Sequence, residues 1–525
     1  MSPSPESPAA PAGAEICPPE SGEPAQGRLR LGAILSVAAL VLVAFVGSTW
    51  AAFVDIEAGS FDVDVQAPRL WPAPSRLGAT AMGIDDQGRA VIWGERSEGI
   101  SGTGVTKVDE NASASVVALP EGRAIVILTG GSQDGYYASS ETFVVALDDR
   151  GQVWTWGFGS DNFFGGRTPD TTYPVSKPGP VAIPERVVDI QATSETTYAL
   201  TVSGAVYSWG DDYHDATGQG AKAGEAAVAR RILTGIHSIG ATHWSAWAVA
   251  APGWTSITYD NKESATVGSQ SAPNAKGGLL FWGFQSTGSG GGASGDGRST
   301  GNYAVPTLVA DSSPLSLALV AGAAAGDDNV SLGVRAGSAQ DQGTFQQMTG
   351  SYWGCQFRLR DGSLFLWGYS TEYNSGTDVT MAGTISSYVP QRVTLSAPVV
   401  QVAHTEDIIL LLDSTGTAWL YGNRVRSRNY PDATGAPVPA TGADVRLPMR
   451  IDGGASYPGW AAGSIADIAC FGYSTALLHK DGSVWLVGGG VQGAGGNGRH
   501  IVRNYLDTRN TVPSTPAQPL TRLNF

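Results

Sequence analysis

The chain has 525 residues, of which 42% are hydrophobic and 15% are charged, and its formal net charge at pH 7 is −15. This balance excludes a largely disordered chain, and the excess of acidic residues argues against a nucleic-acid partner, because it would repel phosphate backbones. The 70 Gly and 30 Pro, beside 15 Trp and 17 Tyr, are typical of many short strands joined by tight turns.

The N-terminal segment sets the expected compartment. Residues 1–30 are rich in Pro, Ala, Ser and Glu, which predicts a disordered cytoplasmic tail. No charged residue occurs over 31–54, and this run is long enough for one transmembrane helix or an uncleaved signal anchor. Arg28 and Arg30 precede the run and acidic residues follow it, so we expect a single-pass cell-membrane protein with its body outside. The alternative is a signal peptide cleaved within 47–52, which would give a secreted protein.

Residues 55–77 are predicted to be a linker, and the body after them is repetitive. A turn glycine, alternating apolar residues, and an aromatic or apolar anchor followed by Gly recur seven times, with the turn glycine always five positions before the anchor. The glycine and anchor pairs are Gly88 and Trp93, Gly151 and Trp156, Gly204 and Trp209, Gly277 and Trp282, Gly362 and Trp367, Gly416 and Tyr421, and Gly482 and Val487. Gly accepts the positive φ of a hairpin turn, so each copy predicts a β-hairpin.

Anchors recur at intervals of 53 to 85 residues, which fits one four-stranded blade each. The sequence therefore predicts an all-β fold, a seven-bladed β-propeller over 78–525. Pro-led segments between the copies predict edge strands or strand starts, and they begin at Pro184, Pro306, Pro390 and Pro448. Residues 251–276 are predicted to lie outside the blade core. Residues 519–525 are predicted to close the ring by joining the sequence around 78–94.

The third copy, over 192–210, resembles the regulator-of-chromosome-condensation repeat family. The resemblance covers about 78–525 and implies a propeller that binds a partner, here a bacterial and extracytoplasmic one. The eponymous member of the family is a nucleotide-exchange factor on chromatin, a role that the export segment and the acidic composition argue against here. Secreted bacterial relatives include an inhibitor of β-lactamases.

Residues that could carry chemistry are scattered. Cys17, Cys355 and Cys470 form no CxxC motif, and the six His residues form no ligand pair, so we expect no metal and no cofactor. A disulfide between Cys355 and Cys470 stays open. The segment 472–476 resembles a nucleophile elbow, but the repeat places Ser474 on an ordinary strand. The acidic loop with Asp211, Asp212 and Asp215 could hold a cation weakly or could simply be solvated.

Loops that follow the anchors all emerge on one face of a ring of equivalent hairpins, where they could form a composite binding surface. Aromatic and Arg side chains are the usual anchors of protein interfaces. The candidate surface residues are Tyr213, Tyr373, Tyr430, Arg424 and Arg426. Phe158, Phe284 and Tyr369 directly follow an anchor Gly, and we expect them to pack between blades.

The favoured function is an extracytoplasmic, membrane-tethered binding module that recognises a protein or a cell-envelope polymer through one propeller face. It is expected to be a monomer and not an enzyme. The alternatives are an inhibitor of a secreted enzyme and, in a different class, a hydrolase or lyase on a propeller scaffold. The feature that would discriminate them is a convergent set of acid, base or metal-binding groups, which the sequence does not contain in any recognisable motif.

Overall fold

The computed structural model describes the chain from residue 69 to residue 519, with gaps. The described residues are 69–70, 80–94, 99–106, 114–132, 142–166, 175–220, 226–242, 244–250, 256–261, 266–271, 279–284, 301–309, 347–350, 354–358, 362–369, 386–393, 395–404, 408–422, 445–451, 462–471, 474–480, 484–488 and 518–519.

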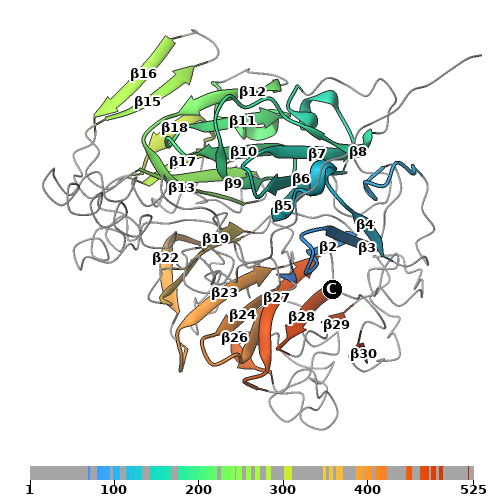
Figure 1. Cartoon of the computed structure of the whole chain (residues 1–525). Helices are drawn as coiled ribbons and strands as arrows, with labels where there is room; N and C mark the ends of the chain where they lie inside the picture. Colours follow the sequence, from blue (N-terminus) through green and yellow to red (C-terminus); the bar gives the residue numbers. More distant parts are fainter. Residues whose placement is uncertain are drawn as a thin grey trace, which may run out of the picture. The chain divides into compact units, whose positions relative to one another are not determined.

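Strands in these ranges form seven antiparallel sheets, and Figure 1 shows them coloured in chain order. Each of the first two sheets pairs four strands in sequence order. Sheet 1 contains β1 (Arg69–Leu70), β2 (Thr80–Ile84), β3 (Ala90–Gly94) and β4 (Ser115–Val117). Sheet 2 contains β5 (Ile125–Ser132), β6 (Thr142–Asp148), β7 (Val153–Phe158) and β8 (Val175–Pro180).

A hairpin that is inserted in the sequence of the fourth sheet pairs with the third sheet. Sheet 3 contains β9 (Val187–Ala192), β10 (Thr196–Thr201), β11 (Val206–Gly210) and β12 (Ala226–Leu233), extended by β15 (Ser256–Asn261) and β16 (Thr266–Ser271). Sheet 4 contains β13 (Ile236–Ala241), β14 (Ser245–Ala250), β17 (Leu279–Gly283) and β18 (Tyr303–Leu308). The hairpin thus leaves sheet 4 and adds to sheet 3 through the pair Leu233 and Tyr259. Of the segment 251–276 that was predicted to lie outside the blade core, the described residues 256–261 and 266–271 lie outside sheet 4.

The last three sheets again pair four strands in sequence order. Sheet 5 contains β19 (Gln347–Gly350), β20 (Gly354–Arg358), β21 (Leu364–Tyr369) and β22 (Ser386–Val393). Sheet 6 contains β23 (Val399–His404), β24 (Ile408–Asp413), β25 (Ala418–Gly422) and β26 (Val445–Arg450). Sheet 7 contains β27 (Ile465–Phe471), β28 (Ser474–His479), β29 (Val484–Gly488) and β30 (Gln518–Pro519). Three short 3-10 helices are described as well: η1 (Pro120–Gly122), η2 (Asp161–Phe164) and η3 (Tyr213–Asp215).

The predicted hairpins are the second and third strands of these sheets. Five of the seven turn glycines are described, and they have φ between 70° and 83°: Gly88, Gly151, Gly204, Gly362 and Gly416. Only glycine adopts this backbone conformation without strain. In the turn of sheet 2, the Asp148 carboxylate accepts the backbone N–H of Arg150 at 2.9 Å and of Gln152 at 2.8 Å, which fixes the turn.

Those turns also bond each sheet to the next. The carbonyl of the turn glycine accepts a backbone N–H from the first strand of the following sheet at five junctions. These turn-glycine bonds join Gly88 to Ile125 (2.7 Å), Gly151 to Val187 (3.0 Å), Gly204 to Ile236 (3.0 Å), Gly362 to Val399 (3.3 Å) and Gly416 to Ile465 (3.2 Å). A Cβ at Gly204 would lie 2.9 Å from the Ile236 carbonyl oxygen, so glycine also permits the close approach.

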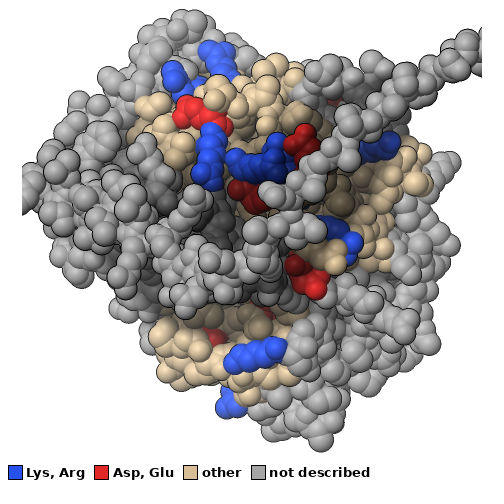
Figure 2. Space-filling view, in the orientation of Figure 1, with Lys and Arg blue, Asp and Glu red and all other residues tan. Residues whose placement is uncertain are grey.

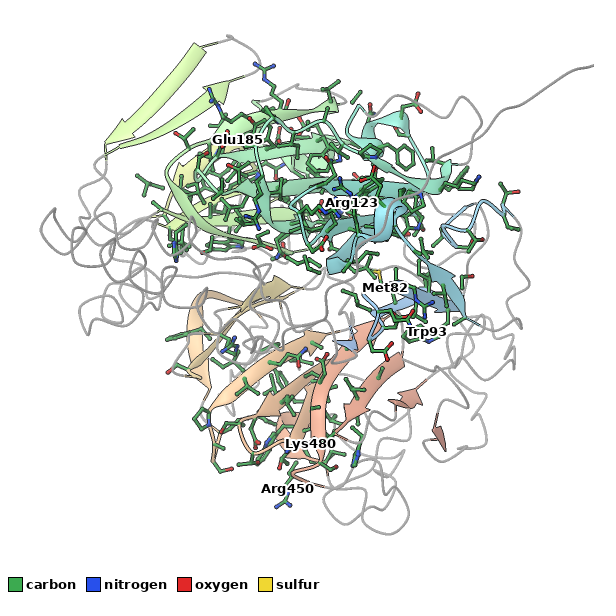
Figure 3. The ribbon with its side chains drawn as sticks, viewed as in Figure 1. Met82, Trp93, Arg123, Glu185, Arg450 and Lys480 are labelled. Carbon is green, nitrogen blue, oxygen red and sulfur yellow. The ribbon has the colours of Figure 1, made fainter. Side chains whose placement is uncertain are left out.

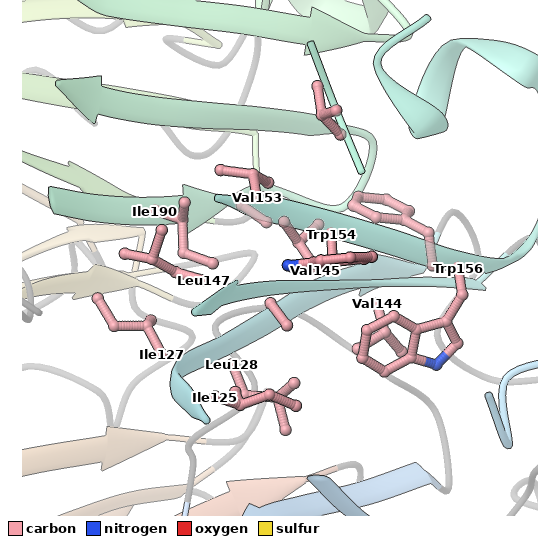
Figure 4. Packing of buried hydrophobic residues seen from close by; sticks show 14 of the residues in the cluster. Ile125, Ile127, Leu128, Val144, Val145, Leu147, Val153, Trp154, Trp156 and Ile190 are labelled. Carbon is pink, nitrogen blue, oxygen red and sulfur yellow. The ribbon is translucent and has the colours of Figure 1, made fainter. Parts of the chain in front are cut away.

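The core lies between the faces of adjacent sheets. All residues of β5 and β6 are buried, because each sheet is covered on both sides. Figure 4 shows Leu147 and Val153 of sheet 2 in one cluster with Ile190 of β9. In sheet 1, Met82 and Trp93 are the corresponding buried residues (Figure 3). Alternate residues of a strand point to opposite faces of its sheet, so they lie in two different cores.

The described strands form an all-β β-propeller, in which the first strands of successive sheets are neighbours. β9 contacts β5 and β13, β19 contacts β13 and β23, and β27 contacts β23. β1 contacts both β27 and β28. The first sheet therefore meets the last one.

Two short strands near the ends of the described chain bear on the sequence expectations. Arg69 and Leu70, inside the predicted linker, form β1, which pairs with Ile84 and Gly83 of β2. Of the predicted closing segment 519–525, only Pro519 is described; it belongs to β30 and pairs opposite Trp485 of β29, and residues 520–525 lie outside the described residues. Sheet 7 thus takes its fourth strand from the C-terminal segment, and the N-terminal segment supplies the strand that meets sheet 7.

Three of the four Pro-led segments lie in edge strands, as predicted: β18, β22 and β26 hold Pro306, Pro390 and Pro448. Pro184 is not in a strand; it precedes β9. The predicted membrane span at 31–54 lies outside the described residues, as does the tail before it. Within the part of the chain that the structure describes, no helix has the length and apolar character needed to cross a membrane.

Candidate binding surface

Of the five candidate surface residues, one is placed by the structure. Tyr213 begins η3, in the loop between β11 and β12, and its side chain is not described. Tyr373, Tyr430, Arg424 and Arg426 lie outside the described residues. The part of the predicted face that the structure describes comprises the loops after β3, β7 and β11 in sheets 1 to 3, and the residues before β14 and after β17 in sheet 4. We call this surface the loop face.

The anchor tryptophans hold these loops in place. The indole N–H of an anchor donates a hydrogen bond to a backbone carbonyl in the loop of the preceding sheet. The bonds join Trp156 to Ile100 (3.0 Å), Trp209 to Phe163 (3.1 Å) and Trp282 to Ala216 (3.1 Å). Each acceptor stands seven residues after the preceding anchor. These indole–carbonyl bonds join neighbouring sheets at the loop face, as the turn-glycine bonds do at the opposite ends of the strands.

A glycine lies beside each indole. Gly102, Gly165 and Gly218 have φ of 67° or 68° and stand nine residues after an anchor. A Cβ at Gly218 would lie 2.7 Å from Cδ1 of Trp282, so the ring occupies the space that a side chain would need. The repeated offsets of seven and nine are visible in the sequence. The same offset of nine falls on Gly291, within the Gly-rich run after the fourth anchor.

The acidic residues of the third loop have structural roles. The Asp212 carboxylate accepts the backbone N–H of Thr217 at 2.9 Å and also the hydroxyl of that residue. The Asp211 carboxylate accepts the side-chain N–H of Asn162 at 2.6 Å, which ties the loop that contains η3 to η2 of the preceding sheet. In the described ranges, no three His, Cys, Asp or Glu side chains gather in a way that could hold a metal ion.

Next to this loop, three aromatic side chains from two sheets meet, and we call them the aromatic cluster: His214, Trp244 and Phe284. The ring centre of His214 lies 4.6 Å from that of Trp244 and 4.2 Å from that of Phe284. Trp244 and Phe284 are edge to face at 5.0 Å, and the Phe284 N–H donates to the Trp244 carbonyl at 3.1 Å. All three residues are half-buried, so each keeps some surface in contact with solvent.

Phe284, which was expected to pack between blades, belongs to sheet 4 and contacts His214 in η3 of sheet 3, but its side chain is only half-buried. Phe158, its counterpart in sheet 2, is half-buried at the end of β7. The side chain of Tyr369 lies outside the described residues. Sequence reasoning selected Tyr213 in this loop and missed its neighbour His214, because a lone His carries no motif.

His214 and Asp215 have an unusual backbone. Both have φ of 62°, in the left-handed region that residues with a Cβ rarely adopt. This conformation costs about 1 kcal/mol or more per residue and persists only where the surroundings enforce it. Burial lowers the pKa of the His214 imidazole from its ordinary value, and the nearby charge of Asp215 partly opposes that shift. Burial therefore favours the neutral form of the imidazole.

Two further sequence questions are answered at described positions. Cys470 is a free, buried thiol, so the disulfide with Cys355 that the sequence left open is absent. Burial raises the pKa of the Cys470 thiol, which keeps it protonated and unreactive. Ser474 begins β28 opposite Gly488 in a regular ladder, which confirms an ordinary strand position. It has none of the strand-turn-helix setting of a nucleophile elbow.

No protein-family model matches the sequence. Solved structures resemble the fold at low sequence identity. Prp20p from Saccharomyces cerevisiae, in a study of its binding to Gsp1p and histones, is 15% identical over 80% of this chain and 92% of that chain, with a TM-score of 0.52. Yeast RCC1 (Prp20) with bound Kap60 gives 14% identity, 84% and 93% coverage and a TM-score of 0.53.

Human WBSCR16 is similar as well, with 16% identity over 83% of this chain and 94% of that chain and a TM-score of 0.50. At these identities the likeness concerns the fold alone. The chain shares the β-propeller architecture of RCC1-like proteins.

Proposed function

We propose that this chain is a protein-binding propeller of the regulator-of-chromosome-condensation repeat type, with seven blades in one closed ring. The seven sheets and the contact of β1 with β27 and β28 support the blade count and the closure. The seven hairpin copies of the sequence support the family. Prp20p, which has the same fold, binds the proteins Gsp1p and histones, which supports protein binding as the use of the fold.

Binding takes place on the loop face. The observation that carries this assignment is the aromatic cluster: three half-buried aromatic side chains, contributed by two sheets and held in a fixed arrangement. Aromatic residues in a rigid setting are the common energetic centres of protein interfaces, because they lose little side-chain entropy on binding. The loop on which they depend is fixed by the bond between Trp282 and Ala216.

The protein acts outside the membrane, tethered by residues 31–54. The uncharged run, the basic residues before it and the acidic residues after it support this location. Its role is recognition rather than catalysis, and the partner is an extracellular protein or a cell-envelope polymer. Inhibition of a secreted enzyme is a special case of the same binding.

Capture of surface partners tests this function. The full-length chain in mild detergent is used as bait for surface-labelled proteins, beside the same chain carrying Phe284→Leu and Trp244→Leu. We expect one or a few proteins to be captured by the first bait and lost with the second. Capture that is equal for both baits would contradict the loop face, and binding of purified envelope glycans without any protein would identify the polymer instead.

The location is tested separately. An epitope tag at the C-terminus should be accessible to antibody on intact cells, whereas a tag at the N-terminus should require permeabilisation. The reverse pattern would overturn the proposed orientation. Loss of the N-terminal tag from the mature protein would show that the segment is a cleaved signal.

A further inference from the structure

We propose that strand β16 is an interaction edge that pairs with β16 of a second copy of this chain, so that the inserted hairpins of two copies join edge to edge. The proposal uses none of the residues of the aromatic cluster and goes beyond binding at the loop face. It departs from the monomer that is expected from the sequence. It follows from the pairing of the hairpin, from the composition of its outer strand and from the symmetry of strand pairing.

The hairpin of β15 and β16 receives little support from its own propeller. All six residues of β15 pair with residues of β16. The ladder between the described hairpin and sheet 3 consists of the pair Leu233 and Tyr259. β16 ends the strand order of this sheet, on the side of β15 away from β12 (Figure 1). A two-stranded hairpin is only marginally stable in water, so a further strand added at the edge of β16 would stabilise it.

The composition of β16 differs from that of the other outer strands, which are the strands at the end of each described sheet opposite its first strand. An edge strand that contains Pro or charged residues, or that is very short, pairs poorly with another chain. Five of the seven outer strands contain Pro, namely β8, β18, β22, β26 and β30, and β4 is three residues long. β16 has six residues, Thr-Val-Gly-Ser-Gln-Ser, and contains neither Pro nor a charged residue. It therefore has none of the features that protect an edge.

The lack of charge suits a partner strand that is identical to β16. Lys and Arg are interspersed with Asp and Glu on the face shown in Figure 2, and like charges that meet directly across two strands are destabilising. Pairing of β16 with itself brings no like charges together, whereas β15 contains Asp260. A contact between two identical edges is its own complement, and it closes at the dimer because each copy contributes the same edge.

Symmetry also determines which residues meet. In the dimer, a two-fold axis perpendicular to the sheet makes the two β16 strands antiparallel. Alternate residues of a strand direct their N–H and C=O groups to the same edge, so both members of a pair must be of the same kind. The axis therefore passes beside one residue and not between two. Registers centred on Gly268 or on Ser269 pair residues 266–270 or 267–271 of the two copies, which is five of the six residues of the strand.

The association of the full-length chain tests the proposal. A single pair of short strands buries much less than the roughly 1,200 Å² of a stable interface, so we expect a weak dimer in equilibrium with the monomer. Sedimentation velocity in mild detergent, from about 5 to 200 µM, covers dissociation constants in the micromolar range. A chain that stays monomeric at the highest concentration, or that forms larger polymers, would overturn the proposal.

A matched pair of substitutions locates the contact. Ser269 on β16 lies opposite Thr258 on β15, so Ser269→Lys and Thr258→Lys add the same charge to neighbouring strands. In either register the two positions 269 of a dimer lie within about 8 Å of each other. The two positions 258 are three strand spacings, about 14 Å, apart, which exceeds the Debye length of about 10 Å at 0.1 M salt. We expect Ser269→Lys to raise the dissociation constant of the dimer by about threefold or more and Thr258→Lys to leave it unchanged, and equal effects would refute the contact.

Cysteine cross-linking tests the register. Gly268→Cys and Ser269→Cys each place a thiol beside the two-fold axis in one of the two registers. A disulfide requires Cα atoms within about 7 Å, a limit that the central residue meets and position 258 does not. Under mild oxidation we expect a disulfide-linked dimer from one of these two variants, above the level of the parent chain, and none from Thr258→Cys. Absence of the linked dimer from both central variants would contradict the pairing.

Removal of the hairpin is the second test should the point variants disturb it. Replacement of residues 251–277 by Asn-Gly should give a chain that stays monomeric over the same concentration range. A dimer that survives this replacement would place the contact elsewhere and reject β16. If the parent chain is monomeric but Ser269→Lys abolishes the capture of a surface protein, the edge binds another protein and the second copy is the wrong occupant.

Discussion

At the scale of the residue, each turn glycine has two roles: it adopts the positive φ of its own hairpin turn, and its carbonyl bonds to the next sheet. Gly204 has a φ of 82°, and its carbonyl accepts the N–H of Ile236 at 3.0 Å from the next sheet. An added Cβ would be strained by the backbone and would lie 2.9 Å from the Ile236 carbonyl oxygen. A turn glycine therefore matters for its own hairpin and for the junction with the following sheet.

We predict that Gly204→Ala lowers the free energy of unfolding by about 2 to 4 kcal/mol. The cost of the backbone strain at the positive φ adds to the cost of displacing the junction with the following sheet. Gly122→Ala is the matched control, since Gly122 also has a positive φ of 64° but no atom lies within 4 Å of its added Cβ. The control should cost only about 1 kcal/mol. Denaturant unfolding of both variants measures the difference, and equal losses would contradict the junction role.

His214 predicts a pH dependence of stability. Burial lowers its folded-state pKa below the ordinary value of 6.5, so as pH falls the unfolded state takes up the proton first. The stabilising contribution is therefore fully present above pH 6.5 and is lost as pH falls through the lowered pKa. We expect His214→Asn, which tolerates a positive φ, to show a smaller loss of stability between pH 7.5 and pH 5 than the parent chain. A larger loss in the variant would reverse the sign and reject the assignment.

At the scale of the element, the repeat made the hairpins predictable. A fixed offset of five residues between turn and anchor is enough to define register, and even the fifth copy keeps it, with buried Arg358 opposite Leu364 where other copies pair two apolar residues. β1 was not predictable, because a strand of two residues carries no alternation. The aromatic cluster was missed for a similar reason: its three members come from separate loops that meet only in three dimensions.

The inserted hairpin of β15 and β16 predicts a tolerated deletion. β14 and β17 are neighbours in sheet 4, with Val249 opposite Leu279, so their ends are close enough for a two-residue turn. We expect replacement of residues 251–277 by Asn-Gly to leave a folded β protein, because the ladder between the described hairpin and sheet 3 consists of the pair Leu233 and Tyr259. Far-UV circular dichroism and thermal unfolding test this, and a cooperative loss of structure would contradict it.

At the scale of the whole molecule, bonds between sheets occur at both ends of the strands. Sheets 2 and 3, for example, are joined by the turn-glycine bond of Gly151 with Val187 and by the indole–carbonyl bond of Trp209 with Phe163. A repeat array stabilised by its neighbours loses half of those contacts at each free end. In the closed ring that we propose, no sheet has a free end, so the junction between sheets 1 and 7 should matter more than its small size suggests.

The last prediction compares the two short strands at this junction. β1 pairs with β2 and also contacts β27 and β28, whereas the two described residues of β30 pair with β29. Replacing Arg69 and Leu70 by Pro should remove ladder hydrogen bonds and open the junction, at a cost of about 2 to 4 kcal/mol in the free energy of unfolding. Gln518→Pro, beside the native Pro519, disrupts an edge strand in the same way and should cost less than about 1 kcal/mol. Thermal unfolding of the full-length variants distinguishes them: a larger loss from Gln518→Pro would mean that the C-terminal strand, and not β1, holds the ring closed.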